Sequence, residues 1–231
     1  MELFFNENID SNTVEFKLDG SENKHITKTL RKKEGEIIEF TNGKKYCFKT
    51  KLINASIKVS TFKVISSYLI KSPKFLHVGI SILKSPSRLE VFFEKAVEIG
   101  VSEITPIIAN RSLKKTLNTK RINKILISAL KQSYKFNLPK LNDPILFDDF
   151  LKINNEKIKL IATCEDLKKH NLYKSYKKNS RNLIMIGPEG DFTMQELEKA
   201  NNNGFKNVSL GDTRLRSETA GIVACVIFSM I

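Results

Sequence analysis

The sequence contains no hydrophobic run long enough to cross a membrane. A spanning helix needs about 20 consecutive apolar residues, and the longest apolar stretches, such as residues 222–231, have roughly half that length. The first residues, MELFFNE, place no cationic region before an apolar stretch, which a secretory signal would need. We therefore expect neither a membrane span nor a secretory signal, and a protein of the cytoplasm.

Cysteine and histidine are scarce, with three of each in 231 residues. The cysteines are Cys47, Cys164 and Cys225. Their odd number and wide separation exclude a disulfide framework and a CxxC metal knuckle, so we interpret them as small apolar side chains. The histidines are His25, His77 and His170. They lack the spacing typical of a metal site, and we expect no metal.

Acidic residues are outnumbered, with 25 Asp and Glu against 39 Lys and Arg, a formal charge of +14 and a pI near 9.6. Such an excess favours a polyanionic partner, and nucleic acid is the usual one. The alternative is that lysine is simply the default surface residue of this chain, because it is spread evenly. The 41% hydrophobic and 28% charged residues fit a folded protein of one large or two modest domains.

The first 70 residues are expected to form a small β unit. Short runs rich in β-branched and aromatic residues predict strands over residues 2–5, 13–18, 36–40, 45–53 and 57–65. Asn42 and Gly43 are typical of a hairpin turn, and residues 24–33 are predicted to form a short helix with a basic face. Five short strands suit a small antiparallel barrel. A Ser-Pro pair marks a joint over residues 66–73.

From Lys74 onward strands and helices alternate. Apolar runs predict strands over residues 75–83, 104–109, 158–163, 182–186 and 208–210. Helical periodicity, with Gly100 as a C-terminal stop and a capping box at Thr193, predicts helices over residues 88–99, 121–133, 194–204 and 217–230. This alternation implies a parallel sheet that is covered on both faces.

Two glycine-bearing turns follow the last two predicted strands, IGPEGDFT over residues 186–193 and LGDTRLRSETA over residues 210–220. Ligands of open α/β sheets bind beyond the carboxyl ends of strands, and glycine lets a ligand approach the backbone closely. Neither GxxxxGK[ST] nor GxGxxG is present in the first turn, so it is not a phosphate loop. Its acidic residue, Glu189, favours a cationic or neutral ligand. For each turn alone, the alternative is an ordinary strand-to-helix connection.

In the second turn, Arg214, Arg216 and Glu218 alternate with other residues. A guanidinium group held by a turn can bind a phosphate or polarise a nucleobase. The alternative is that one arginine pairs with Glu218 or lies in solvent.

Together, IGPEGDFT and LGDTRLRSETA closely resemble the paired C-terminal signatures of the 16S ribosomal RNA uracil-N3 methyltransferases, the RsmE group of SPOUT enzymes. The likeness extends over nearly the whole chain. The N-terminal segment from His25 through Leu30-Arg31 to Gly35 resembles the PUA-like barrel of this family, KAVEIGV over residues 95–101 resembles the start of its catalytic domain, and ALKQS over residues 129–133 resembles its central helix. The two C-terminal motifs are the most specific.

The resemblance implies a SPOUT-type trefoil-knotted parallel-sheet α/β domain over residues 71–231, with the knot near its C-terminus, preceded by a PUA-like β-barrel RNA-binding domain over residues 1–70. It further implies S-adenosylmethionine as cofactor, a homodimer, and 16S rRNA in the small ribosomal subunit as substrate. The knot loops of this family form the cofactor pocket. The matching positions here are Ile186, Gly187, Glu189, Gly190, Leu210, Gly211, Leu215, Arg216 and Ser217.

Uracil N3 must lose its proton before it can accept a methyl group. Arg216 is the candidate that stabilises the resulting anion or grips its phosphate, and Glu218 the candidate that orients this arginine or receives the proton. The alternative for Glu218 is a carboxylate favoured by a helix N-terminus. The candidate RNA backbone contacts are Lys28, Arg31, Lys32 and Lys33. For these the alternative is a solvated helix face.

The sequence departs from the common family pattern at three places. Asp191 stands where a third glycine is frequent, Lys131 and Lys135 stand where Glu and Arg are usual, and the N-terminus lacks an early arginine. Two competing functions are another SPOUT enzyme, such as a 2′-O-ribose methyltransferase, and a non-catalytic RNA-binding assembly factor. An enzyme of nucleotide phosphates ranks last, because the phosphate loop is absent.

Overall fold

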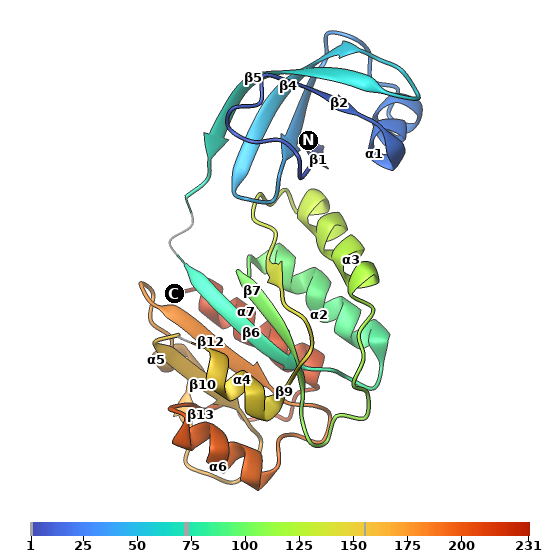
Figure 1. Ribbon diagram of the computed structural model, residues 1–231. Helices are drawn as coiled ribbons and strands as arrows, with labels where there is room; N and C mark the ends of the chain where they lie inside the picture. The colour runs from blue at the N-terminus through green and yellow to red at the C-terminus, as the bar shows by residue number, and fades with distance from the viewer. Residues whose placement is uncertain (1, 72–73, 155) are drawn as a thin grey trace. The chain divides into compact units, whose positions relative to one another are not determined.

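The computed structural model describes residues 2–71, 74–154 and 156–231. The chain forms two compact units, one of residues 1–71 with 127–138 and the other of residues 72–126 with 139–231 (Figure 1). No helix among the described residues has the length and apolar character needed to cross a membrane.

The first unit is built on a five-stranded curled sheet with the order β1-β3-β4-β5-β2. Its strands are β1 (Leu3–Phe5), β2 (Glu15–Leu18), β3 (Ile37–Thr41), β4 (Tyr46–Asn54) and β5 (Ser60–Leu69). All five predicted strands are present. Their pairing is antiparallel except that β1 runs parallel to β3, so the expectation of a wholly antiparallel sheet is wrong at this edge. The sheet encloses a core rich in phenylalanine, with Phe40, Phe48 and Phe62 fully buried.

The predicted hairpin turn connects β3 and β4. Gly43 has a φ of +73°, and a Cβ at this position would lie 2.9 Å from the Cβ of Leu138. The Leu138 N–H donates to the Gly43 carbonyl at 2.8 Å, and the Lys45 N–H donates to the Phe136 carbonyl at 2.8 Å. Two features therefore require glycine at position 43, namely the positive φ of the turn and the close approach of Leu138. The two backbone bonds also attach residues 127–138 to the sheet of the first unit.

The predicted basic helix over residues 24–33 is wrong in its second half. The helix α1 (Gly20–Lys24) continues into a π-helical turn (His25–Thr29) and ends before Arg31, which has a left-handed φ of 55°. Glu36 explains the stop, because it accepts the Lys33 N–H at 2.7 Å and pairs with the Lys32 ammonium at 3.2 Å. Three of the four predicted RNA contacts therefore follow the helix and do not share one of its faces.

The second unit is built on an eight-stranded sheet with the order β11-β13-β10-β12-β6-β7-β8, and β9 also pairs with β7. Its strands are β6 (Phe75–Ser81), β7 (Glu103–Ile108), β8 (Lys140–Leu141), β9 (Ile145–Leu146), β10 (Ile158–Ala162), β11 (His170–Asn171), β12 (Arg181–Ile186) and β13 (Lys206–Ser209). Every pairing is parallel, which confirms the predicted sheet. In the sheet, the strand β12 lies between β10 and β6, so strands that are neighbours in the sheet are not consecutive in the chain.

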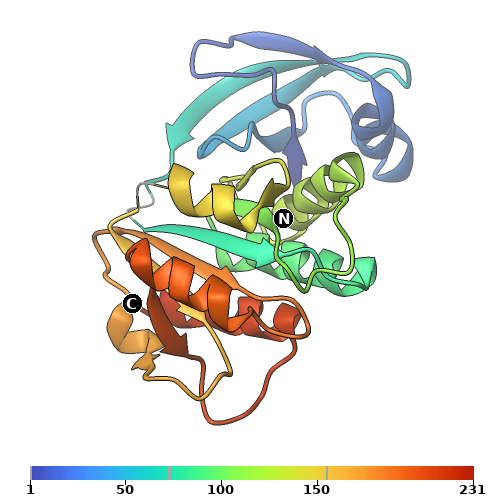
Figure 2. The ribbon, with the colours of Figure 1, turned by 60° about the horizontal axis from the view of Figure 1, so that its bottom comes forward.

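Helices cover both faces of this sheet. They are α2 (Pro86–Ile99), α4 (Phe147–Ile153), α5 (Leu172–Ser175), α6 (Met194–Asn202) and α7 (Ser217–Ser229). The helix α3 (Thr119–Gln132) has residues in both units. Figure 2 shows α4 and α6 on one face and α7 on the other, where it packs against α2. Gly100 ends α2 with a φ of 99°, and Thr193 and Glu196 form the predicted capping box of α6.

The expected fold class, a parallel-sheet α/β domain preceded by a small barrel-like β domain, is confirmed. The predicted joint over residues 66–73 is corrected in its first part, because β5 continues to Leu69. Residues 72–73 lie outside the described part of the chain. The residues of α3 after position 126 cluster with the first unit.

Candidate active site

A pocket of about 650 Å³ lies at the carboxyl ends of β10, β12 and β13. This is the edge at which open parallel sheets bind ligands, and the volume falls in the range of small-molecule sites. The loops after these three strands and the first turn of α7 line it. The lining residues that the sequence analysis singled out are Ile186, Gly187, Glu189, Leu210, Gly211, Leu215, Arg216 and Ser217.

The first signature turn, residues 186–193, is tied to the loops that follow β6 and β7. The Glu189 carboxylate accepts the Lys84 N–H at 3.0 Å, and the Arg111 guanidinium donates to the carbonyl of Gly190. Lys84 follows β6 and Arg111 follows β7. Gly190 lies outside the pocket lining. A Cβ added to Gly190 would lie 3.3 Å from the Cδ of Arg111, so a side chain here would crowd that arginine. These bonds fix the loops of three adjacent strands to one another.

Asp191 ties the same turn to the loop after β10. One of its carboxylate oxygens accepts the Thr163 hydroxyl at 2.9 Å and the Cys164 N–H at 2.7 Å. The other oxygen accepts the N–H of Phe192 at 2.7 Å. The residue has a left-handed φ of 63°, a conformation that aspartate tolerates better than most residues. Asp191 thus keeps the backbone conformation that favours glycine and adds a connection that glycine could not make.

The second signature turn reaches the pocket through its backbone and through the start of α7. Gly211 has a φ of 134°, where a side chain would be strained. The Ser209 hydroxyl donates to the Gly211 carbonyl at 2.9 Å and accepts its N–H at 3.2 Å. Arg216 precedes the first residue of α7 and is exposed. The turn is closed by its own hydrogen bonds, and the Arg216 side chain stays accessible to a ligand.

Glu218 lies in the first turn of α7 and is only 8% exposed. One of its carboxylate oxygens is 3.8 Å from the Nε of Arg88, which belongs to α2 and lines the pocket. Its other oxygen is buried without a hydrogen-bond partner among the described residues, and Glu218 does not belong to the pocket lining. Arg214 or Arg216 was the expected partner from the sequence, whereas the ion pair in the structure is with Arg88. Nothing in the sequence relates the first turns of α2 and α7, because only their packing against each other brings them together.

The loop after β10 is a part of the site that the sequence analysis missed. Thr163, Cys164 and Lys169 line the pocket, together with Asp191 and Asp212 from the two signature turns. The first two could have been found, because the strand predicted over residues 158–163 ends at the same edge of the sheet. The roles of all the lining residues in cofactor binding and catalysis stay predictions.

The predicted RNA contacts belong to the first unit. The side chains of Lys28, Arg31 and Lys33 are exposed, and Lys32 is half-buried beside Glu36. They are available to a polyanion, and their role as RNA contacts stays a prediction.

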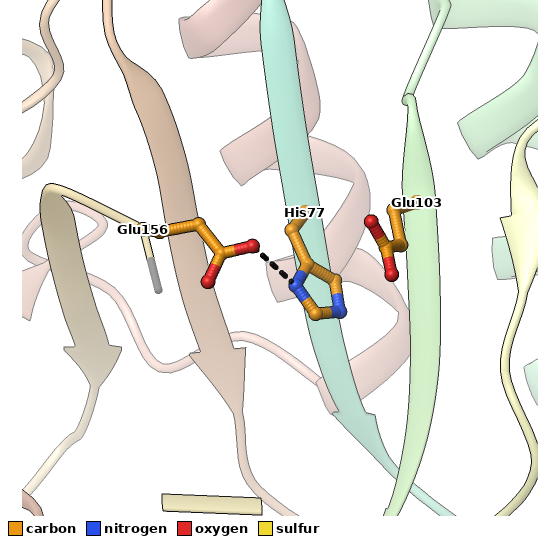
Figure 3. A group of neighbouring side chains, drawn as sticks. All are labelled: His77, Glu103 and Glu156. Carbon is orange, nitrogen blue, oxygen red and sulfur yellow. Dashed lines mark hydrogen bonds and ion pairs between the residues drawn. The ribbon is translucent and has the colours of Figure 1, made fainter. Parts of the chain in front are cut away.

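At the amino ends of the strands, His77, Glu103 and Glu156 come together from three separate elements (Figure 3). One potential ligand atom from each lies within 4.8 Å of the others. The His77 Nδ1 is 3.0 Å from a carboxylate oxygen of Glu156, and its Nε2 is 2.7 Å from the Thr105 hydroxyl. Burial raises the pKa of Glu156, but its bonds to His77 and the charge of Arg181 outweigh burial, and the net pKa is lowered.

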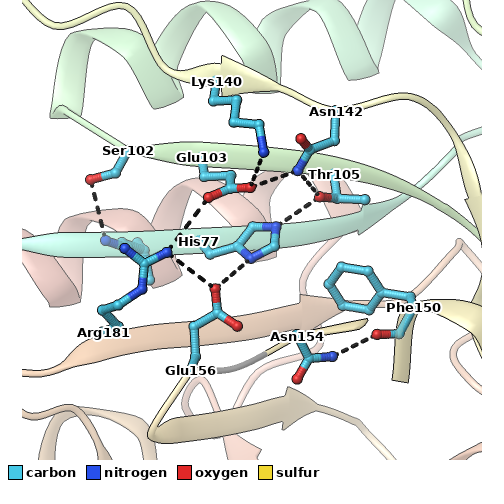
Figure 4. A network of polar contacts seen from close by, with 11 residues as sticks. His77, Ser102, Glu103, Thr105, Lys140, Asn142, Phe150, Asn154, Glu156 and Arg181 are labelled. Atoms are coloured by element: carbon cyan, nitrogen blue, oxygen red, sulfur yellow. Dashed lines mark hydrogen bonds and ion pairs between the residues drawn. The ribbon is translucent and has the colours of Figure 1, made fainter. Parts of the chain in front are cut away.

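Two cations already neutralise the carboxylates of this group (Figure 4). The Arg181 guanidinium lies 3.8 Å from Glu103 and 3.7 Å from Glu156, and the Lys140 ammonium lies 3.2 Å from Glu103. Since both ring nitrogens of His77 also have partners, the arrangement suits a structural polar network better than a metal centre. Residues 77, 103 and 156 share no local spacing in the sequence, so this arrangement could not be predicted from it. We call these residues with Thr105, Lys140, Asn142 and Arg181 the polar network.

The family described as an RNA methyltransferase domain matches residues 71–229. The chain is 34% identical over 234 residues to the Ribosomal RNA small subunit methyltransferase E of Buchnera aphidicola subsp. Acyrthosiphon pisum, covering 96% of this chain and 90% of that one. It is 38% identical over 154 residues to the protein of the same name in Mesomycoplasma hyopneumoniae, with 63% and 65% covered.

Several solved structures resemble the chain over almost its whole length. A probable rRNA-methyltransferase from Porphyromonas gingivalis has a TM-score of 0.88 and 33% identity, covering 97% of this chain and 95% of that one. The Ribosomal RNA small subunit methyltransferase E of Neisseria gonorrhoeae, bound to S-adenosyl methionine, has a TM-score of 0.86 and 26% identity with the same coverage.

Proposed function

The chain belongs to the RNA methyltransferase domain family, and from that premise we propose that it transfers a methyl group from S-adenosylmethionine to N3 of a specific uridine in 16S ribosomal RNA. The observation that carries this proposal is the pocket at the carboxyl edge of the parallel sheet. Both signature turns line it, and Arg216 is exposed where α7 begins beside them. The names of the similar proteins support ribosomal RNA of the small subunit as the substrate.

The chemistry of the pocket fits S-adenosylmethionine. Gly187 and Gly211 leave backbone groups accessible for the adenine and ribose, while Glu189 and Asp212 supply negative charge near a cationic ligand. Lys169 and the arginines of the second turn supply positive charge for the carboxylate of the methionine part. When bound, the cofactor supplies an electrophilic methyl group on a positively charged sulfur.

The residues of this chain must then prepare uracil N3 as a nucleophile. Arg216 stabilises the negative charge that develops on the ring oxygens when N3 loses its proton. Glu218 holds Arg88 at the pocket through one oxygen, which makes it a positioning residue. Its unpartnered oxygen is buried and does not line the pocket, so it can receive the proton only through a bridging group such as a water molecule. The methyl group moves from sulfur to N3, and the cofactor leaves as neutral S-adenosylhomocysteine. Alignment of the two reacting atoms can contribute about 7–11 kcal/mol to such a step.

We further propose that the first 70 residues form the RNA-binding domain, that the substrate is the small ribosomal subunit in the cytoplasm, and that the enzyme is a homodimer. The exposed basic residues of the first unit, with Arg31 and Lys33 after α1, support backbone contacts there.

Methyl transfer from labelled S-adenosylmethionine to small subunits that lack the modification tests the function. The expected product is labelled 3-methyluridine after nucleoside digestion, with no label on subunits that already carry it. A labelled 2′-O-methylribose would replace the proposal with the other SPOUT activity. Absence of both label and cofactor binding would favour a non-catalytic assembly factor.

A further inference from the structure

A second pocket, of about 320 Å³, lies in the second unit between α5 and the strands β10 and β13. Five lysines line it, and we call it the lysine pocket; they are Lys157, Lys159, Lys174, Lys177 and Lys206. Lys157 directly precedes β10 and Lys206 begins β13. The pocket therefore extends to the amino ends of these strands, whereas the candidate active site lies beyond their carboxyl ends.

The lysines of this pocket lack the acidic partners that other lysines of the same unit have. Lys199 pairs with Asp148 at 2.7 Å and Lys152 with Asp149 at 3.1 Å. Within residues 2–71, 74–154 and 156–231, no acidic side chain lines the lysine pocket or lies within ion-pairing distance of its lysines. One of these positive charges has an aromatic partner, because the Lys159 ammonium lies 5.8 Å from the centre of the Phe205 ring. Five like charges around one hollow repel each other unless an anion enters.

Phosphate is the anion that suits this lining. Lysine binds phosphate as a compact point charge with three rotatable donors, and it needs no fixed geometry. Four of the five side chains are exposed, so a backbone of many phosphates can reach them. A contact of this kind fixes the position of a nucleic acid without reading its sequence.

We propose that the lysine pocket is an additional contact for the phosphate backbone of the ribosomal RNA substrate, separate from the candidate active site. This proposal rests on the proposed function for the identity of the RNA. The pocket holds an RNA segment that is distant from the methylated base, and it thereby adds affinity and fixes the orientation of the substrate on the catalytic unit.

The test uses the full chain with Lys174→Ala and Lys206→Ala combined. Each phosphate contact contributes a slope of about −0.7 to −0.9 to the plot of log affinity against log salt. Loss of two contacts should make the salt slope shallower by about 1.4–1.8. Between 50 and 200 mM salt, the wild type should then lose about tenfold more affinity for the small-subunit RNA than the variant. The KM for the RNA substrate should rise at low salt, while kcat and the Kd for S-adenosylmethionine stay unchanged.

A matched control removes the same charge from paired lysines, with Lys152→Ala and Lys199→Ala combined. Both are exposed and lie on the same unit, so the change in net charge is identical. The control should keep the slope of the wild type, and Lys174→Arg with Lys206→Arg should also keep it. A shallower slope in the control as well would show a general effect of net charge and would overturn the proposal.

Two further arms distinguish other ligands from the RNA backbone. Unchanged slope and KM in the first variant would overturn the proposal, even if inorganic phosphate or polyglutamate binds to the wild type and not to the variant. The proposed function fails separately, if the wild type leaves the uridine of small subunits unmethylated. The salt slope is measured by RNA binding alone, so it tests the lysine pocket whether or not methyl transfer occurs.

Discussion

The polar network at the amino ends of the strands and the candidate active site at their carboxyl ends use polar side chains in opposite ways. At the amino ends, His77 and Glu156 are buried and bonded to each other and to their neighbours in the polar network. At the carboxyl ends, hydrogen bonds are used mainly to fix loop backbones, and Arg216 remains exposed. The polar network therefore pairs its charged groups with one another and leaves one buried oxygen of Glu156 without a partner, whereas the candidate active site keeps Arg216 free to bind a ligand.

The difference follows from what each end must do. Buried polar groups destabilise a fold unless they are paired, and the polar network balances two carboxylates with Lys140 and Arg181. A binding site needs the reverse, namely rigid positions with unused bonding capacity. The bonds of Asp191 and Arg111 supply the rigidity at the carboxyl edge. We therefore expect substitutions in the polar network to change stability and those in the candidate active site to change catalysis.

The largest expected effect is on stability, from His77→Ala. Removing one partner of a buried pair leaves the Glu156 carboxylate without its closest bond, which typically costs about 3–5 kcal/mol. The midpoint of urea unfolding should fall with an unchanged m-value, and kcat at 25 °C should stay normal. His170→Ala is the control, because His170 is an exposed histidine of the same unit. A loss of kcat without a loss of stability would contradict the division between the two ends.

The next effect is on catalysis, from Arg216→Ala. Loss of one donor to a developing anion typically lowers kcat by about 10²–10³-fold, or roughly 2.7–4 kcal/mol. Unfolding should be unchanged, because Arg216 is exposed. Arg214→Ala, which alters a second arginine of the same pocket, should have a smaller effect on single-turnover methyl transfer. Methylation near the wild-type rate in the Arg216 variant would remove this residue from the mechanism.

A third, intermediate effect is expected on the KM for S-adenosylmethionine when the bonds of Asp191 are removed. Asp191→Gly keeps the left-handed backbone but releases the loop after β10. Thr163→Val removes the hydroxyl that donates to Asp191 and accepts the Glu165 N–H, and it leaves the bond from the Cys164 N–H to Asp191 in place. A hydrogen bond to a charged group contributes about 1.5–3 kcal/mol, so the KM for S-adenosylmethionine should rise about tenfold or more in the glycine variant and less in the valine variant. The kcat at saturating cofactor should change little, as expected for a positioning residue. A fall in kcat with constant KM would instead assign Asp191 to the chemistry.

Local sequence signals predicted the elements that local physics determines. The capping box at Thr193, the stop at Gly100 and the apolar strands of the sheet are all where the sequence analysis expected them. Both signature turns line one pocket, because the carboxyl ends of parallel strands meet at one edge. The strands β8, β9 and β11 have two residues each, which is too short to show a period.

The features that the sequence analysis missed depend on contacts between distant residues. Arg88 meets Glu218 only because α2 packs on α7, and His77 meets Glu156 only because the strands and loops of the sheet bring them together. The prediction of a helix over residues 24–33 was wrong in its second half because of a similar side-chain contact, in which the Glu36 carboxylate accepts the Lys33 N–H. Such contacts leave no periodic signal, so a single sequence does not reveal them.

A smaller effect concerns the pH dependence of stability, which we expect to depend on the polar network. The pKa values of Glu156 and Glu103 are lowered in the folded protein, since their bonds to His77 and Asn142 and the neighbouring positive charges outweigh the effect of burial. A lowered folded pKa stabilises the fold above the unfolded value of about 4.3 and loses this contribution as the pH falls through the folded value. Glu156→Gln should therefore flatten the acid limb of stability, measured by urea unfolding between pH 3 and about 6. An unchanged acid limb would show that the network is not the acid-sensitive element.

The smallest expected effect is a change in the rate of cysteine alkylation, and it examines the carboxyl end without a substitution. Cys164 is exposed and lines the candidate active site, whereas Cys47 and Cys225 are buried, and burial raises the pKa of both buried thiols. Since the thiolate is the reactive form, iodoacetamide should modify Cys164 first. Bound S-adenosylmethionine should slow this reaction several-fold, in proportion to the occupied fraction of the pocket. Inorganic phosphate, which is expected at the lysine pocket, should leave the rate unchanged. Equal protection by both ligands would mean that the two pockets are coupled, and the proposed separation of cofactor and backbone binding would then be wrong.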